Sequence, residues 1–175
     1  DWVKVVSLKG GPSMNGKLYT LAAKVAAMEA LKSGVTTLAD FNYLQHDQDI
    51  PRACIETLEQ MGIRGVYMDC YHDTGSEMGV FPGYIHAGDA CVKRTDALVR
   101  EYVNQRHPLT RVMIGASVPW GTTEGLYRAM VEYSNATRIP YTMHILETEE
   151  DNSASLRSFG KPLIPALEEL WVLTA

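Results

Sequence analysis

The stretch Asn15–Tyr43, NGKLYTLAAKVAAMEALKSGVTTLADFNY, joins a helical pattern to a strand pattern with almost no loop between them. Its first part is rich in alanine, and Asn15 is a residue type that caps helix starts. Larger apolar residues recur there at helical spacing, namely Leu18, Leu21, Ala22, Val25, Met28 and Leu31. Gly34 suits the left-handed position after a helix, and the apolar, β-branched residues that follow are typical of a buried parallel strand. The stretch predicts one helix-to-strand unit of an α/β protein.

The alternation of helix and strand patterns continues to the end of the chain. Further strands are predicted within 63–73, 109–120 and 139–147, and further helices within 49–62, 91–107, from Thr122 or Thr123 onward, and within 152–173. A glycine-rich loop is expected over 74–90, and the last helical region is expected to break at Gly160, Pro162 and Pro165. Strict alternation with short connections implies parallel strands joined by right-handed crossovers.

Two architectures fit four such strands, an open doubly wound sheet or part of a (β/α)8 barrel. No G-x-G-x-x-G or G-x-x-x-x-G-K-[ST] follows any predicted strand, which removes the usual argument for a nucleotide-binding open sheet. A complete barrel usually needs about 250 residues, more than the 175 of this chain. We expect one domain over residues 1–175, made of a portion of a barrel.

Composition limits the partners and the compartment. The net charge of −5 argues against a nucleic-acid or anionic-membrane partner, since both require clustered lysine and arginine. No apolar run approaches the length of a transmembrane helix. Cys54, Cys70 and Cys91 form no C-x-x-C and are expected to be free thiols, which predicts a cytoplasmic protein. Because the chain begins at Asp1 and ends after an apolar helix-like run, we expect a piece of a longer protein.

The segment YTMHILETEED, residues 141–151, carries a histidine inside an apolar strand pattern. Period-two alternation puts Tyr141, Met143 and Ile145 on one face and His144 on the other. The apolar face is expected to pack on helices, which leaves His144 on the polar side of the sheet or in the barrel lumen.

Strand carboxyl ends hold the chemistry in both architectures. A neutral imidazole at such an end is a natural ligand for a divalent metal, and Glu147 just past the strand can transfer protons over the same site. A histidine packed at the rim is the competing interpretation, since a catalytic metal needs three or more protein ligands. The acidic residues 149–151 are expected in a solvated loop or the first turn of a helix.

The chain resembles the amidohydrolase superfamily, in particular the branch of cytosine/guanine deaminases and triazine hydrolases. The matching segments are AAKVAAMEALKSGVTTLADF, MGIRGVYM, RVMIGASVPW, IPYTMHILETEEDN and FGKPLIPALEELWVL. They extend across essentially the whole chain, and the most specific motif is H-x-x-E at His144 and Glu147. The resemblance implies a metal-dependent (β/α)8 barrel, of which this chain supplies about units 2 to 5.

The resemblance also implies roles for individual residues. His144 matches a ligand of zinc or iron, and Glu147 matches the acid–base residue of hydrolytic deamination or dehalogenation of a cyclic purine, pyrimidine or triazine-like substrate. Relatives often carry a histidine where this chain has Ser117, so we expect Ser117 to contact the substrate in its place. Trp120 is expected to stack on the substrate ring, with packing at the rim as the alternative.

His46, His72 and Asp73 are predicted on loops that face the same side as these residues. They can contact the substrate there, but we expect them to be ordinary surface loop residues. Asp40 is expected to have a structural role and to hydrogen-bond loop amides. The family's H-x-H of the first strand does not occur in the chain, and its distal histidine and aspartate are also missing. We therefore expect the 175 residues alone to be inactive.

Two other functions stay open at this point. The chain can be a non-catalytic half-barrel, a binding or interaction protein that forms a homo-oligomer to cover its open sheet edges. It can also belong to a different barrel enzyme that shares only the fold.

Overall fold

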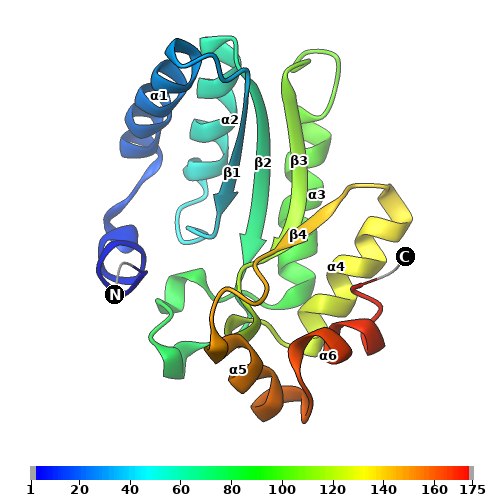
Figure 1. The fold of residues 1–175 in the computed structure, drawn as a ribbon. Coiled ribbons are helices and arrows are strands. Elements are labelled where there is room, and N and C mark those ends of the chain that lie inside the picture. The colour runs from blue at the N-terminus through cyan, green and yellow to red at the C-terminus, as the bar shows by residue number, and fades with distance from the viewer. Residues whose placement is uncertain (1–2, 174–175) are drawn as a thin grey trace. The chain divides into compact units, whose positions relative to one another are not determined.

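The computed structural model describes residues 3–173, in which helices and strands alternate as predicted (Figure 1). The helices are α1 Gly16–Lys32, α2 Asp49–Met61, α3 Gly88–Tyr102, α4 Glu124–Thr137, α5 Glu149–Phe159 and α6 Leu163–Glu169. The strands are β1 Thr37–Asn42, β2 Arg64–Tyr71, β3 Thr110–Ala116 and β4 Tyr141–Met143. A π-helical segment spans Val3–Gly10, and short 3-10 turns span Gly11–Ser13, Ser76–Met78, Pro82–Tyr84 and Pro119–Gly121.

The four strands form one sheet in the order β1-β2-β3-β4, which is also their order along the chain. The pairings of β1 with β2 and of β3 with β4 are parallel. The register sets Asp40 opposite Tyr67, and Ile114 opposite Tyr141. Parallel neighbours in chain order are what the helix–strand alternation predicts, and this prediction is confirmed.

The chain divides into two compact units. Unit 1 runs to Asp69 and includes Arg94–Met113, whereas unit 2 consists of Cys70–Lys93 and the chain from Ile114 onward. Each unit has its own cluster of buried apolar side chains. The single domain expected over 1–175 stays a prediction, and the two units are described separately.

In unit 1, α1 packs on α2 through alanines. Asn15 caps α1 by accepting a hydrogen bond from the Leu18 amide at 3.0 Å, and Gly34 has a φ of 85°, both as predicted. The buried residues of the helix are Gly16, Ala23, Ala27 and Ala30. The larger apolar residues of the stripe are exposed, up to 62% for Leu21. Small side chains let the two helices approach closely, so the alanine face is the covered one.

The rest of the unit 1 core follows the sequence pattern. Ile55 and Leu58 of α2 are buried, and Gly62 ends this helix with a φ of 73°. They join residues of β2, β3 and α3, including Tyr67, Tyr102 and Val112. The predicted apolar face of α2 is confirmed.

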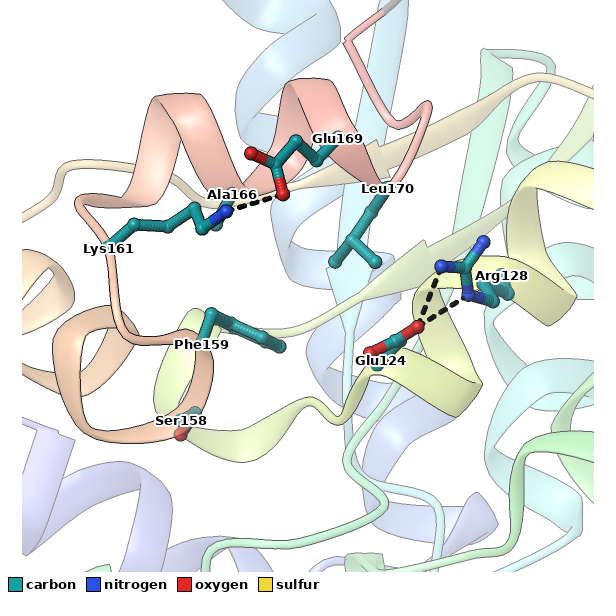
Figure 2. A pocket seen from close by; sticks show the side chains of 8 residues that line it. All are labelled: Glu124, Arg128, Ser158, Phe159, Lys161, Ala166, Glu169 and Leu170. Carbon is teal, nitrogen blue, oxygen red and sulfur yellow. Dashed lines mark hydrogen bonds and ion pairs between the residues drawn. The ribbon is translucent and has the colours of Figure 1, made fainter.

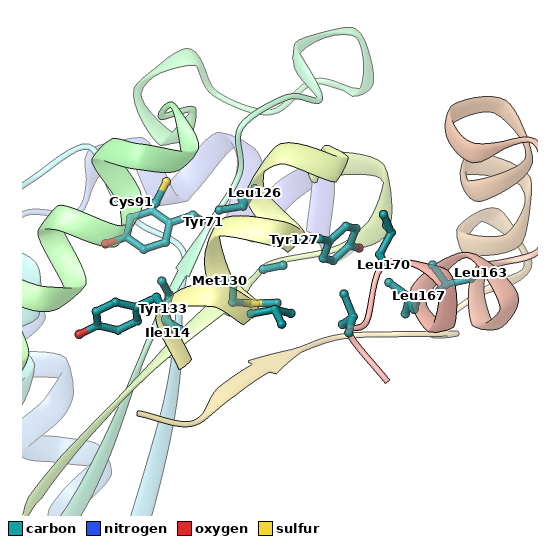
Figure 3. Packing of buried hydrophobic residues seen from close by; sticks show 13 residues of the cluster. Tyr71, Cys91, Ile114, Leu126, Tyr127, Met130, Tyr133, Leu163, Leu167 and Leu170 are labelled. Carbon is teal, nitrogen blue, oxygen red and sulfur yellow. The ribbon is translucent and has the colours of Figure 1, made fainter. Parts of the chain in front are cut away.

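In unit 2, α4 packs on β3, β4 and α6. Thr123 caps α4 by accepting a hydrogen bond from the Leu126 amide, and the predicted stripe of Leu126, Met130 and Tyr133 is buried. Figure 3 shows side chains of α4 reaching toward Leu167 and Leu170. Tyr141, Met143 and Ile145 pack against this cluster, as the alternation in the sequence predicts.

Several boundaries differ from the prediction. β4 has only the three residues Tyr141–Met143, so His144 follows the strand instead of lying within it. α3 already begins at Gly88, inside the expected loop. Pro165 does not break α6 because it lies in the first turn, where a missing backbone donor costs nothing. Within residues 3–173, no helix has the length and apolar character that a membrane crossing requires.

Candidate active site

The carboxyl end of β4 presents His144 to solvent. Residues on either side of it in the alternation are fixed in the unit 2 core, and the His144 amide donates to the Ser117 carbonyl at 3.4 Å. The residue is exposed. The predicted orientation of the two faces is therefore confirmed on the apolar side, while the role of His144 as a metal ligand stays a prediction.

Glu147 lies on the turn between β4 and α5 and is also exposed. The residue before it, Leu146, has a φ of 54°, a conformation that side chains other than glycine adopt rarely. The Glu147 amide donates to Oδ2 of Asp151 at 2.8 Å. Thr148 then caps α5, so the acidic residues 149–151 form the first turn of this helix, one of the two places expected for them.

Asp151 differs from its acidic neighbours because it is only 1% exposed. No sequence pattern distinguishes it from Glu149 and Glu150, which are exposed. Its Oδ2 is the acceptor for the Glu147 amide. Asp151 is therefore a buried group that contacts the backbone of the candidate site.

Ser117 immediately follows β3 and is 3% exposed. Its amide donates to the Tyr71 carbonyl at 2.9 Å, and its carbonyl accepts from His144. The backbone of Ser117 thus links the ends of β2, β3 and β4 within unit 2. The substrate contact expected of its side chain stays a prediction.

Trp120 lies on the 3-10 turn after β3 and is half-buried. Its ring is 6.1 Å from the ring of His72, at an interplanar angle of 31°. One part of the indole is therefore packed against the protein, while part of it faces solvent. Both predicted roles, stacking on a substrate and packing at the rim, are compatible with this position.

The expectation that His72 is a surface loop residue is wrong. The residue is 3% exposed, and burial lowers the pKa of its imidazole to about 4. A Cβ on Gly121 would lie 2.2 Å from its Nδ1, so glycine is required for the turn to pass this ring. Asp73 is half-buried and bonds both the amide and the hydroxyl of Thr123, so it fixes the start of α4.

The strands β2, β3 and β4 approach one another closely at Gly115, just before Ser117 and His144. A Cβ on Gly115 would meet Sγ of Cys70 at 2.6 Å and the Thr142 carbonyl oxygen at 2.8 Å. Cys70 is fully buried and, like Cys54 and Cys91, is a free thiol. The three strands therefore approach one another only because residue 115 has no side chain.

In unit 1, the polar residues at the ends of β1 and β2 are engaged by neighbouring side chains. Oδ2 of Asp40 accepts from the Tyr19 hydroxyl at 2.6 Å and from the Cys54 thiol at 3.0 Å. Burial, followed by the charge of Asp40, raises the pKa of both donors. Asp40 therefore has a structural role, as predicted, but its partners differ from the prediction. The donors are side chains of helices α1 and α2, whereas loop amides were expected.

Asp69 at the end of β2 is fully buried, and its carboxylate accepts two hydrogen bonds. It accepts from Nε2 of Gln45 at 2.9 Å and from the Thr95 hydroxyl at 2.7 Å. Arg94 in turn donates to the side chain and the carbonyl of Gln45. His46, in the same loop, is half-buried, with Nε2 2.8 Å from the Met14 carbonyl oxygen. These bonds fix the loop after β1, on which His46 lies as predicted, partly exposed.

A hollow of about 380 Å³ on unit 2 is lined by other residues (Figure 2). Arg128 pairs with Glu124 on one side of it, and Lys161 pairs with Glu169 on the other. None of the four predicted site residues lines this hollow. Its charged side chains are paired with one another across short distances.

The described residues contain no group of three or more histidine, cysteine or acidic side chains that can hold a metal ion. His144 and Glu147 are thus brought to the same turn, with Ser117 beside them, but a full set of metal ligands is not assembled between residues 3 and 173. The sequence reasoning missed Asp151 and Gly115. The close spacing of Asp151 to Glu147 was the only available signal for the first.

Comparison with known proteins links this geometry to a group of hydrolases. The family model described as "Amidohydrolase family" matches residues 1–165. Among curated proteins, 5'-deoxyadenosine deaminase of Methanopyrus kandleri is 26% identical over 151 residues, which is 86% of this chain and 32% of that protein. 8-Oxoguanine deaminase of Pseudomonas aeruginosa is 26% identical over 159 residues, 86% of this chain and 34% of its own length.

Solved structures support the fold. A crystal structure of a mutant atrazine chlorohydrolase from Arthrobacter aurescens, complexed with zinc and atraton, superposes with a TM-score of 0.80 at 19% identity and covers 96% of this chain and 38% of its own. An adenosine deaminase from Xanthomonas campestris with bound zinc gives 0.80 at 15% identity, with 99% and 36% covered. The four strands and their helices are thus a portion of a (β/α)8 barrel. The chain spans about a third of the length of the curated relatives it matches.

Proposed function

Because the chain belongs to the amidohydrolase family, we propose that it is part of a metal-dependent hydrolase that deaminates or dehalogenates a small cyclic substrate of the purine, pyrimidine or triazine type. The observation that carries the proposal is the turn after β4. It exposes His144 and Glu147, three residues apart, while Tyr141, Met143 and Ile145 pack against the buried cluster of unit 2. The free, buried thiols favour a cytoplasmic protein.

His144 is the metal ligand that this chain contributes. An exposed imidazole on a short turn whose flanking residues are fixed suits zinc or iron, because little ordering is needed on binding. Within residues 3–173, no three histidine, cysteine or acidic side chains are grouped so that they can hold a metal ion. The remaining ligands are therefore expected from other parts of the full-length protein. When bound, such an ion supplies a Lewis acid that makes water a nucleophile near neutral pH.

Glu147 is proposed as the acid–base residue. Its carboxylate is exposed at the end of the turn and is therefore accessible to a substrate ring. It accepts a proton from the attacking water and passes it to the ring nitrogen or the leaving group. The reaction then releases ammonia from an amino-substituted ring or chloride from a chlorinated one.

Ser117 and Trp120 are proposed to bind the substrate. Ser117 follows β3 directly beside His144, to which it is joined by a backbone hydrogen bond. The exposed part of the Trp120 ring offers an apolar face on which a flat heterocycle can stack. The histidine that packs on the other part of this indole keeps it in a fixed orientation.

The test uses the full-length protein that contains this chain. Wild type is expected to retain about one zinc or iron per metal site, and His144→Ala to lose metal affinity by at least about 10-fold. His107→Ala is the matched control, because His107 lies in unit 1 and packs on Tyr102, and it should retain the metal. Unchanged metal content in His144→Ala would favour a different barrel enzyme.

Activity is measured as ammonia released from 5'-deoxyadenosine or 8-oxoguanine and as chloride released from atrazine, the compounds in the names of the relatives. Glu147→Gln is expected to keep the metal and to lose about 10²- to 10⁴-fold in kcat. A full reading frame without the missing ligands, together with no metal and no turnover, would favour the non-catalytic half-barrel and its homo-oligomer.

A further inference from the structure

The turn that carries Glu147 is held by one buried acid. Asp151 is 1% exposed, although Glu147, Glu149 and Glu150 around it are all exposed. Removing a carboxylate from water is costly unless hydrogen bonds and local dipoles compensate. Here the start of α5 offers a favourable field, and the Glu147 amide donates to Oδ2 at 2.8 Å.

The backbone next to this bond is in an uncommon conformation. Leu146 has a φ of 54°, which is unfavourable for a residue with a branched side chain. Such a conformation persists only where surrounding contacts hold it. Ile145 packs in the core on one side of Leu146, and the bond to Asp151 fixes Glu147 on the other.

We propose that Asp151 is a positioning residue for Glu147: its buried carboxylate holds the Glu147 amide and thereby fixes the backbone from which the acid–base side chain projects. The inference rests on the proposed function, because it assigns Asp151 a part in the reaction only through Glu147. Asp151 itself is buried and does not touch the substrate.

Hydrogen exchange tests the contact without any assay of activity. In the full-length protein, the Glu147 amide should exchange about 10-fold or more slowly than in Asp151→Ala, because the variant removes its acceptor. Glu149→Gln is the matched control, since it removes a charge from the same helical turn at an exposed position. Equal exchange of the Glu147 amide in wild type and Asp151→Ala would overturn the proposal.

Kinetics test the consequence. Asp151→Ala is expected to lower kcat about 10- to 100-fold, with KM changed less than about 3-fold and zinc content unchanged, because misplacement of a reacting group acts on the chemical step. Glu149→Gln should behave as wild type. In the Glu147→Gln background, Asp151→Ala should cause no further loss, whereas a merely structural role would lower activity in both backgrounds.

The two levels of the proposal fail in different ways. Full activity of Glu147→Gln would reject the proposed acid–base role, whereas an inactive Glu147→Gln beside a fully active Asp151→Ala would reject only the positioning role. If Asp151→Ala does not fold, Asp151→Asn replaces it. This isosteric variant should lose at least about 3-fold in kcat, since a neutral amide is the weaker acceptor, and an unchanged kcat would overturn the need for a carboxylate.

Discussion

The strand ends around Asp40 and Asp69 in unit 1 contrast with the turn after β4 in unit 2. In unit 1, Asp40 and Asp69 accept hydrogen bonds from side chains of the surrounding helices and loop. In unit 2, the turn after β4 leaves the side chains of His144 and Glu147 exposed and fixes their backbone. A polar residue at a strand end thus serves the fold when its side chain is buried and hydrogen-bonded, whereas an exposed side chain on a fixed backbone is accessible to a ligand.

The difference has a simple physical basis. A buried carboxylate needs several donors, and Asp69 has them in Gln45 and Thr95 because β1, β2 and α3 meet around it. An exposed imidazole such as that of His144 keeps contact with water, which a stronger ligand can displace. Exposure on a fixed backbone therefore combines availability with precise orientation.

The largest difference in stability is expected between variants that lose a bonded and an exposed strand-end side chain. Asp69→Ala is expected to lower the free energy of unfolding by about 3 kcal/mol, because two buried donors lose a charged acceptor. His144→Ala should change it by less than about 0.5 kcal/mol in metal-free protein, as is usual for exposed side chains. Urea unfolding monitored by circular dichroism measures both, and similar losses would contradict the distinction between a bonded and an exposed strand-end residue.

The backbone support of the exposed turn can be tested at Gly115. Gly115→Ala should destabilise the protein by about 2 kcal/mol, because its Cβ would overlap the Cys70 thiol and the Thr142 carbonyl. Gly125→Ala is the control: its Cβ meets nothing closer than Thr123 Oγ1 at 3.4 Å, and alanine is favoured inside α4 by roughly 0.5–1 kcal/mol. Thermal unfolding of the two variants should therefore shift in opposite directions.

The orientation of the site could be predicted from sequence because it depends on a local rule. Alternation of side chains along residues 141–145 set His144 opposite the core-facing residues, and the packing of these residues agrees. The H-x-x-E spacing likewise brought Glu147 to the same turn. Both depend only on neighbours in the chain.

What sequence could not provide are the contacts between segments. The role of Asp151 depends on the left-handed backbone conformation of Leu146. The sequence does not predict this conformation, because it is usual for glycine or asparagine and not for leucine. The stripe of α1 was correctly identified as apolar, yet the alanine face is the one that α2 covers. Periodicity in the sequence defines the faces of a helix, but which face is buried depends on the element that packs against it.

His72 sharpens the comparison, because it follows β2 in unit 2 and yet is only 3% exposed, unlike His144 after β4. Burial lowers the pKa of its imidazole to about 4, below the value of about 6.5 in an unfolded chain. Between these values the unfolded state binds more protons than the folded state, so stability falls as the pH is lowered from 6.5 toward 4. The contribution of His72 to this loss should be about 2 kcal/mol at pH 5.

The measurement compares urea unfolding of wild type and His72→Gln at pH 8 and pH 5, since glutamine does not titrate. Other groups also titrate over this range, but they affect both proteins alike, so the drop in stability should be about 2 kcal/mol smaller in the variant. Equal drops would mean that the folded ring takes up a proton as readily as the unfolded one. Water would then reach the His72 ring where it lies beside Trp120 and Gly121.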